Sequence, residues 1–309
     1  MSDLILHHYP GSPFAEKVRL IFGYKNLAWK SVTIPRIMPK PDLIALTGGY
    51  RRTPVLQLGA DVFCDTALIA EVLERAAPNP PLYPPAHAGA ARMIAQWADT
   101  HLFWTAIPYT MQPEGLKAMF AGATPEQIKA FGADRAAMRN NAPRMAVGEA
   151  IGQARVFVDW IDRIFADGRP YACGDTPTIA DFSLYHPLWF ILRAPPVAGI
   201  LEGREHLRAW RERMREYRHG THEDMSSADA IAVAHAATPA QGAEAFADVH
   251  GFAKGEKVRV MPTDYAFDPV MGELMISTAN EIAVRRTDER AGEVVVHFPR
   301  VGYQMAKAE

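Results

Sequence analysis

The sequence predicts an α/β domain, then an all-α helical bundle, then a small antiparallel β-barrel-like domain. Three observations lead to this order. Strand-like apolar runs alternate with helical patterns over residues 1–77, and apolar residues recur at helical spacing over residues 86–218. Over residues 254–309, short apolar runs are separated by turn residues. We expect residues 219–253 to form a helical linker in front of these strands.

The first elements are expected to be a strand, a helix and a second strand. Residues 4–9 and 29–35 form apolar, strand-like runs, and residues 13–22 follow a helical pattern. Ser12 stands where it can cap that helix, and Pro13 takes the first helical position, where a missing amide proton costs nothing.

A hairpin and another helix follow. Apolar runs at residues 55–58 and 62–64 flank a Gly-Ala-Asp turn, and a helix begins at Asp65 and Thr66. Such a unit offers a peptide-like ligand an exposed strand edge at Pro54–Val55. It also offers a helix N-terminus that can bind a carboxylate.

The helical domain begins after a proline-dense segment at residues 76–85, which cannot continue the preceding helix. Within the domain, Thr178 and Asp181 have the spacing of a capping box in which aspartate replaces the usual glutamate. Loss of such a cap costs about 1 kcal/mol.

The C-terminal part is expected to hold at least four strands, in the runs at residues 257–261, 272–278, 281–286 and 294–298. Runs this short and this close together suggest a small antiparallel barrel. Before them, the alanine-rich residues 226–247 are either a helix or a tether.

Taken together, these motifs resemble the glutathione transferase family. The order strand, helix, strand, helix, hairpin, helix is that of its thioredoxin-like, glutathione-binding domain. Ser-Pro-Phe at residues 12–14, followed by Val-Arg at residues 18–19, is like the tau-type members. The Gly-Asp and Thr-x-x-Asp motif at residues 174–181 is typical of the helical domain. The resemblance covers residues 1–218, so the C-terminal strands are an addition to the family pattern.

The resemblance implies that Ser12 activates the thiol of glutathione. That thiol has an ordinary pKa of about 8.5, so roughly 3% of it is thiolate at pH 7. A hydroxyl that donates a hydrogen bond, together with the N-terminus of a helix, stabilises the thiolate. Tyr9, at the end of the same strand, is the competing activator, although a packing role is the alternative for it.

The same resemblance implies how the rest of glutathione is held. The backbone of Val55 would pair with the cysteinyl part, next to a cis bond between Thr53 and Pro54. Asp65 would bind the γ-glutamyl ammonium group, and Thr66 the γ-glutamyl carboxylate. Asp65 is one methylene shorter than the glutamate common in the family.

Two further groups complete this expected site. Phe14 stands in the first turn of the helix that Ser12 caps. Arg52, with Arg51 before it, stands where the family often places a basic residue against the glycyl carboxylate. The alternative for adjacent arginines on a loop is that both are simply solvated.

The second substrate is expected between the two domains, in a pocket lined by the first helices of the bundle. Tyr9, His101, Trp104 and Tyr109 are the candidate lining residues. They are aromatic-rich, so a small apolar or aromatic electrophile is expected. Packing in the bundle core is the alternative.

Composition limits the other possibilities. The chain of 309 residues has 49% hydrophobic residues and a formal net charge of −2, which gives no reason to expect nucleic-acid binding. No apolar run is long enough to cross a bilayer. Cys64 and Cys173 form no disulfide framework and no zinc motif. We therefore expect a cytoplasmic protein with no metal cofactor, which forms a homodimer if it follows the family.

Two classes of function remain open at this point. One is an enzyme that conjugates glutathione to an electrophile. The other is a non-catalytic binding or regulatory protein that keeps the transferase scaffold and acts through its C-terminal β domain. Ser12, Pro54 and Thr66 favour the enzyme, whereas Asp65 and the C-terminal addition favour the scaffold protein.

Overall fold

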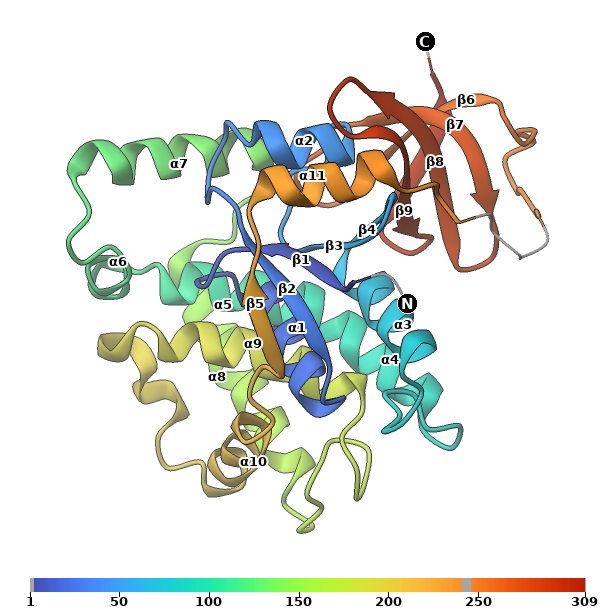
Figure 1. The fold of residues 1–309 in the computed structure, drawn as a ribbon. Coiled ribbons are helices and arrows are strands. Elements are labelled where there is room, and N and C mark those ends of the chain that lie inside the picture. Colours follow the sequence, from blue (N-terminus) through green and yellow to red (C-terminus); the bar gives the residue numbers. More distant parts are fainter. Residues whose placement is uncertain (1–2, 241–245, 309) are drawn as a thin grey trace.

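The computed structural model describes residues 3–240 and 246–308 (Figure 1). In this part of the chain, the strands form one sheet in the order β10-β6-β7-β8-β9-β4-β3-β1-β2-β5. The strands are β1 Ile5–His8, β2 Ala28–Thr33, β3 Val55–Leu58, β4 Asp61–Cys64, β5 Thr221–Asp224, β6 Lys257–Pro262, β7 Val270–Ser277, β8 Glu281–Asp288, β9 Gly292–Pro299 and β10 Tyr303–Lys307.

The centre of this sheet is the thioredoxin-like domain. β1 runs parallel to β2 and antiparallel to β3, and β3 forms the expected hairpin with β4. Its helices are α1 Pro13–Tyr24, α2 Pro41–Thr47 and α3 Thr66–Ala76. Residues of α1 and α3 share one core with the helical domain, whereas residues of α2 belong to a second core on the C-terminal side. The predicted α/β fold of the N-terminal domain is confirmed.

The helical domain packs around α9, which is buried along most of its length. Its elements are α4 Ala88–Trp97, the π-helical turn η1 Ala98–Leu102, α5 Phe103–Thr110, α6 Pro113–Met119, α7 Pro125–Arg139, α8 Val147–Ile164, α9 Ile179–Leu192, the 3-10 helix η2 Pro195–Leu201 and α10 Glu205–Arg215. At the start of α9 the amide of Thr178 donates to Asp181 at 2.9 Å, as the capping motif predicts. The indole of Trp210 also donates to Asp181 at 2.9 Å, so this carboxylate ties α10 to α9.

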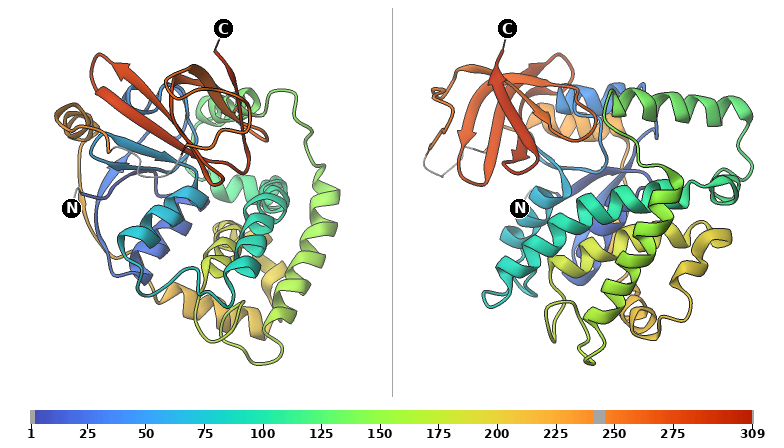
Figure 2. Two further views of the ribbon diagram at one scale, coloured as in Figure 1. Left: turned by 90° about the vertical axis from the view of Figure 1, so that its right-hand side faces the viewer. Right: turned by 180° about the vertical axis from the view of Figure 1, so that it is seen from behind.

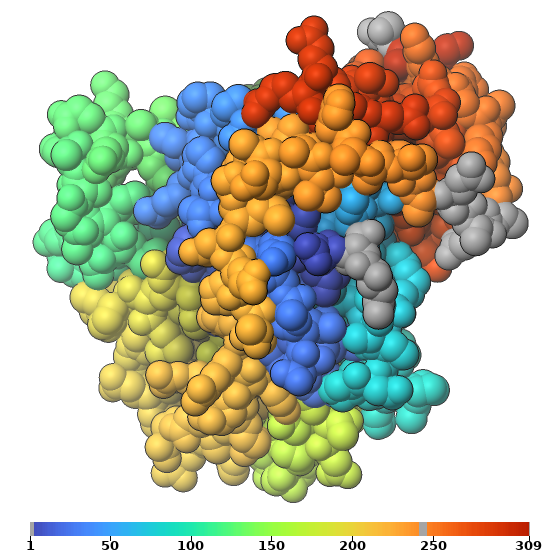
Figure 3. Space-filling model, in the orientation of Figure 1, coloured from blue at the N-terminus to red at the C-terminus, as the bar shows by residue number. Residues whose placement is uncertain are grey.

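The C-terminal extension, residues 219–308 as far as they are described, wraps around the thioredoxin-like domain. β5 pairs in parallel with β2 at one edge of the central sheet. Helix α11 Ser227–Ala236 then packs against α2 and β9. Figure 3 shows this segment lying across the N-terminal domain. Finally β9 pairs in parallel with β4 at the opposite edge.

Two predictions about the C-terminal part of the chain need correction. Residues 219–253 are not simply a helical linker, because they contain β5, and residues 241–245 lie outside the described part of the chain. The strands β6–β10 are antiparallel to one another, as predicted. They form the predicted small antiparallel β unit, but this unit is not separate from the N-terminal domain, because β9 continues the sheet into β4.

The core explains why these strands are not independent. Valine and isoleucine side chains of the extension are buried together with those of the N-terminal domain, in one cluster that includes Ile5, Val32, Val62, Ile231, Val258, Val284 and Val296. Figure 2 shows the C-terminal strands at one end of the molecule and α8 and α10 at the other. Within residues 3–240 and 246–308, no helix is both long and apolar enough to span a bilayer.

Candidate functional site

The expected site lies where β1 ends and β3 begins. His7 is opposite Val55 in the antiparallel register, so Tyr9–Ser12, which follow β1, and Thr53–Pro54, which precede β3, reach the same edge of the sheet. The Thr53–Pro54 bond is cis, as expected. This edge also receives the N-terminus of α1, which brings a helix dipole to the site.

Ser12 caps α1 as the sequence predicts. Its Oγ accepts a hydrogen bond from the amide of Ala15 at 3.2 Å, and its own amide donates to the Tyr9 carbonyl at 3.1 Å. The residue is only 2% exposed. Because the hydroxyl accepts from the helix, its proton is left to donate to a second group.

The structure corrects the expected role of Val55. Val55 is fully buried, and β3 lies between β1 and β4, so its backbone is inside the sheet. Pro54 is buried too. An added strand would need backbone groups that no neighbouring strand uses, and Thr53 lies before β3, outside its pairing with β1 and β4.

Asp65 occupies the start of α3 in a strained conformation. Its φ of 75° lies in a region that non-glycine residues seldom adopt, which is common at functional positions. Its carboxylate accepts from the amide of Ala67 at 2.9 Å and from the hydroxyl of Tyr303 at 3.1 Å. Burial raises the pKa of Asp65. The group expected to bind an ammonium ion therefore already has a donor from β10.

Thr66 connects the two domains through a buried ion pair. Lys17 on α1 donates to the Thr66 hydroxyl at 3.2 Å and to Asp99 on η1 at 2.6 Å. His186 on α9 lies 2.9 Å from Asp99. Burial alone would raise the pKa of Asp99, but the charge of Lys17 and the hydrogen bond from His186 lower it. The Thr66 hydroxyl accepts from Lys17, so its proton can still be donated to a carboxylate.

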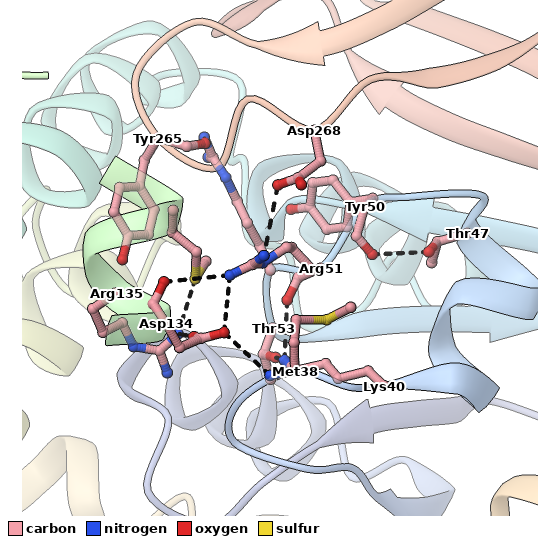
Figure 4. Close-up of polar contacts among 12 residues, drawn as sticks. Met38, Lys40, Thr47, Tyr50, Arg51, Thr53, Asp134, Arg135, Tyr265 and Asp268 are labelled. Carbon is pink, nitrogen blue, oxygen red and sulfur yellow. Dashed lines mark hydrogen bonds and ion pairs between the residues drawn. The ribbon is translucent and has the colours of Figure 1, made fainter. Parts of the chain in front are cut away.

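Both arginines of the expected site are engaged, rather than solvated. Arg51 lies 2.9 Å from Asp134 on α7 and 3.9 Å from Asp268 in the loop after β6 (Figure 4). Arg52 pairs with Asp264 in the same loop at 2.6 Å and donates to the carbonyl of Tyr265. The residue expected to meet the glycyl carboxylate thus meets a carboxylate of the chain itself.

Lys40 is a residue of this site that the sequence did not reveal. It is 3% exposed, and its ammonium donates to the Arg51 carbonyl at 3.0 Å and to the Thr53 hydroxyl at 3.4 Å (Figure 4). Burial, together with the charge of Arg135, lowers the pKa of Lys40 to about 8. The Lys-Pro pair at the start of α2 was the only local signal, and it says nothing about burial.

Phe14 and Trp104 lie in aromatic clusters at the junction of the domains. The centroid of the Phe14 ring lies 4.5 Å from that of Phe103 and 4.5 Å from that of His186. These contacts join α1 to α5 and α9. Trp104 on α5 packs edge-on against Tyr265 at 4.8 Å. The apolar surface expected to meet an electrophile is therefore partly covered by a ring of the extension.

The other three residues expected to line the pocket for the electrophile do not lie together. Tyr109 is 7% exposed and its hydroxyl donates to the Val197 carbonyl at 2.7 Å, so it is a core residue of the bundle and not a pocket wall. His101 is exposed and lies 3.2 Å from the Thr100 hydroxyl. Tyr9 is half-buried at the end of β1, on the side of the second core.

The remaining reactive side chains have structural positions. Burial raises the pKa of the Cys64 thiol well above its usual range, which agrees with a structural cysteine. His7 and His8 are both buried in β1, where burial is the main cause that lowers their pKa to about 4 and about 3. Among the described residues, no group of three histidine, cysteine or acidic side chains could hold a metal ion.

Comparison with known proteins identifies the family. The family model for the glutathione S-transferase N-terminal domain matches residues 6–81, and that for the C-terminal domain matches residues 144–213. A GST-like protein from Pseudomonas syringae is 41% identical, with 100% of each chain covered and a TM-score of 0.83. The chain therefore belongs to the glutathione S-transferase family, and the likeness to the Pseudomonas protein includes the C-terminal extension.

More distant structures share the fold of the first two domains. A glutathione S-transferase from Methylobacterium radiotolerans, in complex with glutathione sulfonate, is 19% identical, with 72% of this chain and 97% of that chain covered and a TM-score of 0.53. One from Rhodospirillum rubrum is 22% identical, with 69% and 87% covered and a TM-score of 0.51.

A curated relative has a different description. FtsZ-localized protein A of Caulobacter vibrioides is 29% identical over 99 residues, which are 30% of this chain. The match spans 43% of the length of that protein.

Proposed function

We propose that this protein binds glutathione at the edge formed by Ser12, Thr53, Asp65 and Thr66, and conjugates the glutathione thiol to a small apolar electrophile. One observation carries the proposal: Ser12 caps α1 with its Oγ 3.2 Å from the amide of Ala15, beside the start of β3. That position gives an incoming sulfur both a hydroxyl proton and a helix N-terminus.

The chemistry follows from this arrangement. The thiol of glutathione loses its proton to water, and the Ser12 hydroxyl donates a hydrogen bond to the resulting thiolate. The sulfur then forms a bond to the electrophilic carbon, and the leaving group departs with the bonding electron pair. Ser12 itself forms no covalent bond. Lowering the thiol pKa from about 8.5 to about 6.5 needs about 2.7 kcal/mol of preferential thiolate stabilisation.

The binding contacts are assigned to the same edge. The backbone of Thr53 replaces that of Val55 as the partner of the cysteinyl part, because Thr53 precedes the buried strand. The Thr66 hydroxyl donates to the γ-glutamyl carboxylate, with the Lys17 ammonium behind it at 3.2 Å. Asp65 binds the ammonium group, and Lys40 or Arg52 supplies the positive charge for the glycyl carboxylate.

A second candidate is a non-catalytic protein that uses the transferase scaffold for binding or regulation. The observation that favours it is that Asp65 and Arg52 are already paired with Tyr303 and Asp264. The partial match to FtsZ-localized protein A is consistent with such a role, although that match covers less than half of the relative.

Binding and turnover assays separate the two candidates. We would measure glutathione binding by calorimetry and conjugation to an aromatic chloride by absorbance, for the wild-type protein and Ser12→Ala. We expect turnover near pH 7 to fall roughly tenfold, because the thiolate loses the hydrogen bond from the Ser12 hydroxyl but keeps the helix N-terminus, while glutathione binding changes little.

Cys173→Ser, a substitution far from the site in sequence and at a buried cysteine, is the matched control and should keep wild-type turnover. Binding without turnover in the wild-type protein would favour the scaffold candidate. Equal turnover of wild type and Ser12→Ala would contradict the role given to Ser12.

A further inference from the structure

The C-terminal extension reaches the candidate site at three separate points. Tyr303 of β10 donates to Asp65 at 3.1 Å. Asp264 lies 2.6 Å from Arg52, and the carbonyl of Tyr265 accepts from the same guanidinium. The ring of Tyr265 packs on Trp104 at 4.8 Å.

Each of these contacts matches, in chemistry, a contact expected from the two substrates. The Tyr303 hydroxyl is a donor to Asp65, as the ammonium group of glutathione would be. The carboxylate of Asp264 pairs with Arg52, as a glycyl carboxylate would. The Tyr265 ring covers Trp104, as an aromatic electrophile would.

The loop that carries Asp264 and Tyr265 is also held in place by other elements. The amide of Ala266 donates to the Met138 carbonyl at the end of α7 at 2.7 Å. Asp268 lies 3.9 Å from Arg51 (Figure 4). Tyr303 is 7% exposed and its hydroxyl lies 3.3 Å from that of Tyr50, which is 3% exposed. These contacts hold the loop and β10 against the site.

We propose that the extension is an intramolecular competitor, whose Tyr303, Asp264 and Tyr265 occupy the places of the two substrates until glutathione displaces them. This inference rests on the proposed function, because it assumes that glutathione binds at Asp65 and Arg52. The apparent association constant for glutathione is then the intrinsic constant multiplied by the fraction of molecules in which the extension has left the site. Weakening the extension's contacts increases that fraction.

The alternative is that these contacts only anchor the extension. The two cases differ in the sign of the effect on binding. If the contacts compete with glutathione, removing them strengthens glutathione binding. If they only anchor the fold, removing them leaves binding unchanged or weakens it, because the neighbouring site becomes less ordered.

Two conservative variants of the full-length chain provide the test. Tyr303→Phe removes the hydroxyl that bonds Asp65 and keeps the ring in the core, and Asp264→Asn removes the charge opposite Arg52. Glutathione dissociation constants are measured by calorimetry for each variant and the wild type. We expect each variant to bind glutathione about tenfold more tightly, which is the weight of one hydrogen bond to a charged group.

Tyr24→Phe is the matched control. Like Tyr303→Phe, it removes one phenol hydroxyl. The Tyr24 hydroxyl donates to the Pro81 carbonyl at 3.2 Å, outside the site. We expect its affinity to equal that of the wild type. Asp264 is exposed, so Asp264→Asn keeps the test valid if Tyr303→Phe does not fold.

The outcomes separate this inference from the proposed function. If both variants bind glutathione as tightly as the wild type, or more weakly, the extension is not a competitor and the proposed function still stands. An absence of glutathione binding in wild type and in both variants would overturn the proposed function, and the competitor with it.

Discussion

Lys17 is the residue whose charge is most completely removed from water near the site. Its side chain is 0% exposed and lies 2.6 Å from Asp99, which is itself largely buried. A buried pair of this kind contributes little compared with apolar residues, but breaking it is costly because one charge is left without a partner. Lys17 also supports Thr66, so this ion pair joins the stability of the domain junction to the binding site.

Lys17→Met tests that dependence. We expect the free energy of unfolding to fall by about 3–5 kcal/mol, because Asp99 keeps its burial and loses its cation. Urea unfolding followed by far-ultraviolet circular dichroism measures the change. Lys30→Met, which breaks an exposed pair with Glu223, is the control and should leave the midpoint unchanged. An unchanged midpoint in Lys17→Met would show that Asp99 is not held by Lys17.

At this scale the sequence predicted local interactions well and distant ones poorly. Ser12 and Asp181 were predicted as caps, because a cap depends on residues within one helical turn. The burial of Val55 inside the sheet was not predicted, because it depends on the pairing of β3 with β1 on one side and with β4 on the other. The contact between Tyr303 and Asp65 joins residues 238 positions apart, and no local pattern can reveal it.

At the scale of single elements, His297 links the strands of the extension to the thioredoxin-like sheet. It lies on β9 between Asp61 of β4, 3.0 Å from Nε2, and Glu281 of β8, 2.6 Å from Nδ1. Its ring stacks on that of Phe63 at 4.4 Å. Burial alone would lower the pKa of His297, but the hydrogen bonds and charges of Asp61 and Glu281 outweigh it and raise the pKa. The ring thus joins β9 of the extension to β4 of the thioredoxin-like sheet, and the two carboxylates favour its protonated form.

A pH dependence of stability follows from this raised pKa. The contribution of His297 is complete below the unfolded-state pKa of about 6.5 and is lost as pH rises through the higher folded-state value. We expect unfolding free energy to decline above neutral pH by up to about 1.4 kcal/mol per pH unit from this group. Urea titrations at a series of pH values measure the slope.

His297→Gln should remove that slope, because glutamine does not titrate. His206→Gln, at an exposed histidine on α10, should keep it. The same slope in His297→Gln and in the wild type would assign the effect to another group.

The elements themselves were largely predictable, and their assembly was not. The observed bounds of β3 are those of the apolar run at residues 55–58. β6, β8 and β9 each contain a predicted run, and β7 contains all but the last residue of the run at 272–278. Alternation within a strand shows which side chains are buried, but it does not show which strand lies alongside. The parallel pairing of β9 with β4 therefore could not be predicted from either segment.

At the scale of the whole molecule, the extension covers both edges of the thioredoxin-like sheet. β5 pairs with β2 and β9 pairs with β4, which protects two edges that could otherwise pair with other chains. Beneath α11 the extension and the N-terminal domain share one hydrophobic core. The homodimer expected from the family remains a prediction, and it has to accommodate β9 beside β4.

Hydrogen–deuterium exchange of the wild-type protein, with and without saturating glutathione, tests the central claim most directly. If glutathione takes the places held by Tyr303 and Asp264, peptides that cover residues 262–269 and 303–307 exchange faster when glutathione is bound, while those covering residues 12–15 and 65–69 exchange more slowly. Protection of all four segments by glutathione would contradict the account, because the extension would then close over the ligand and not give way to it.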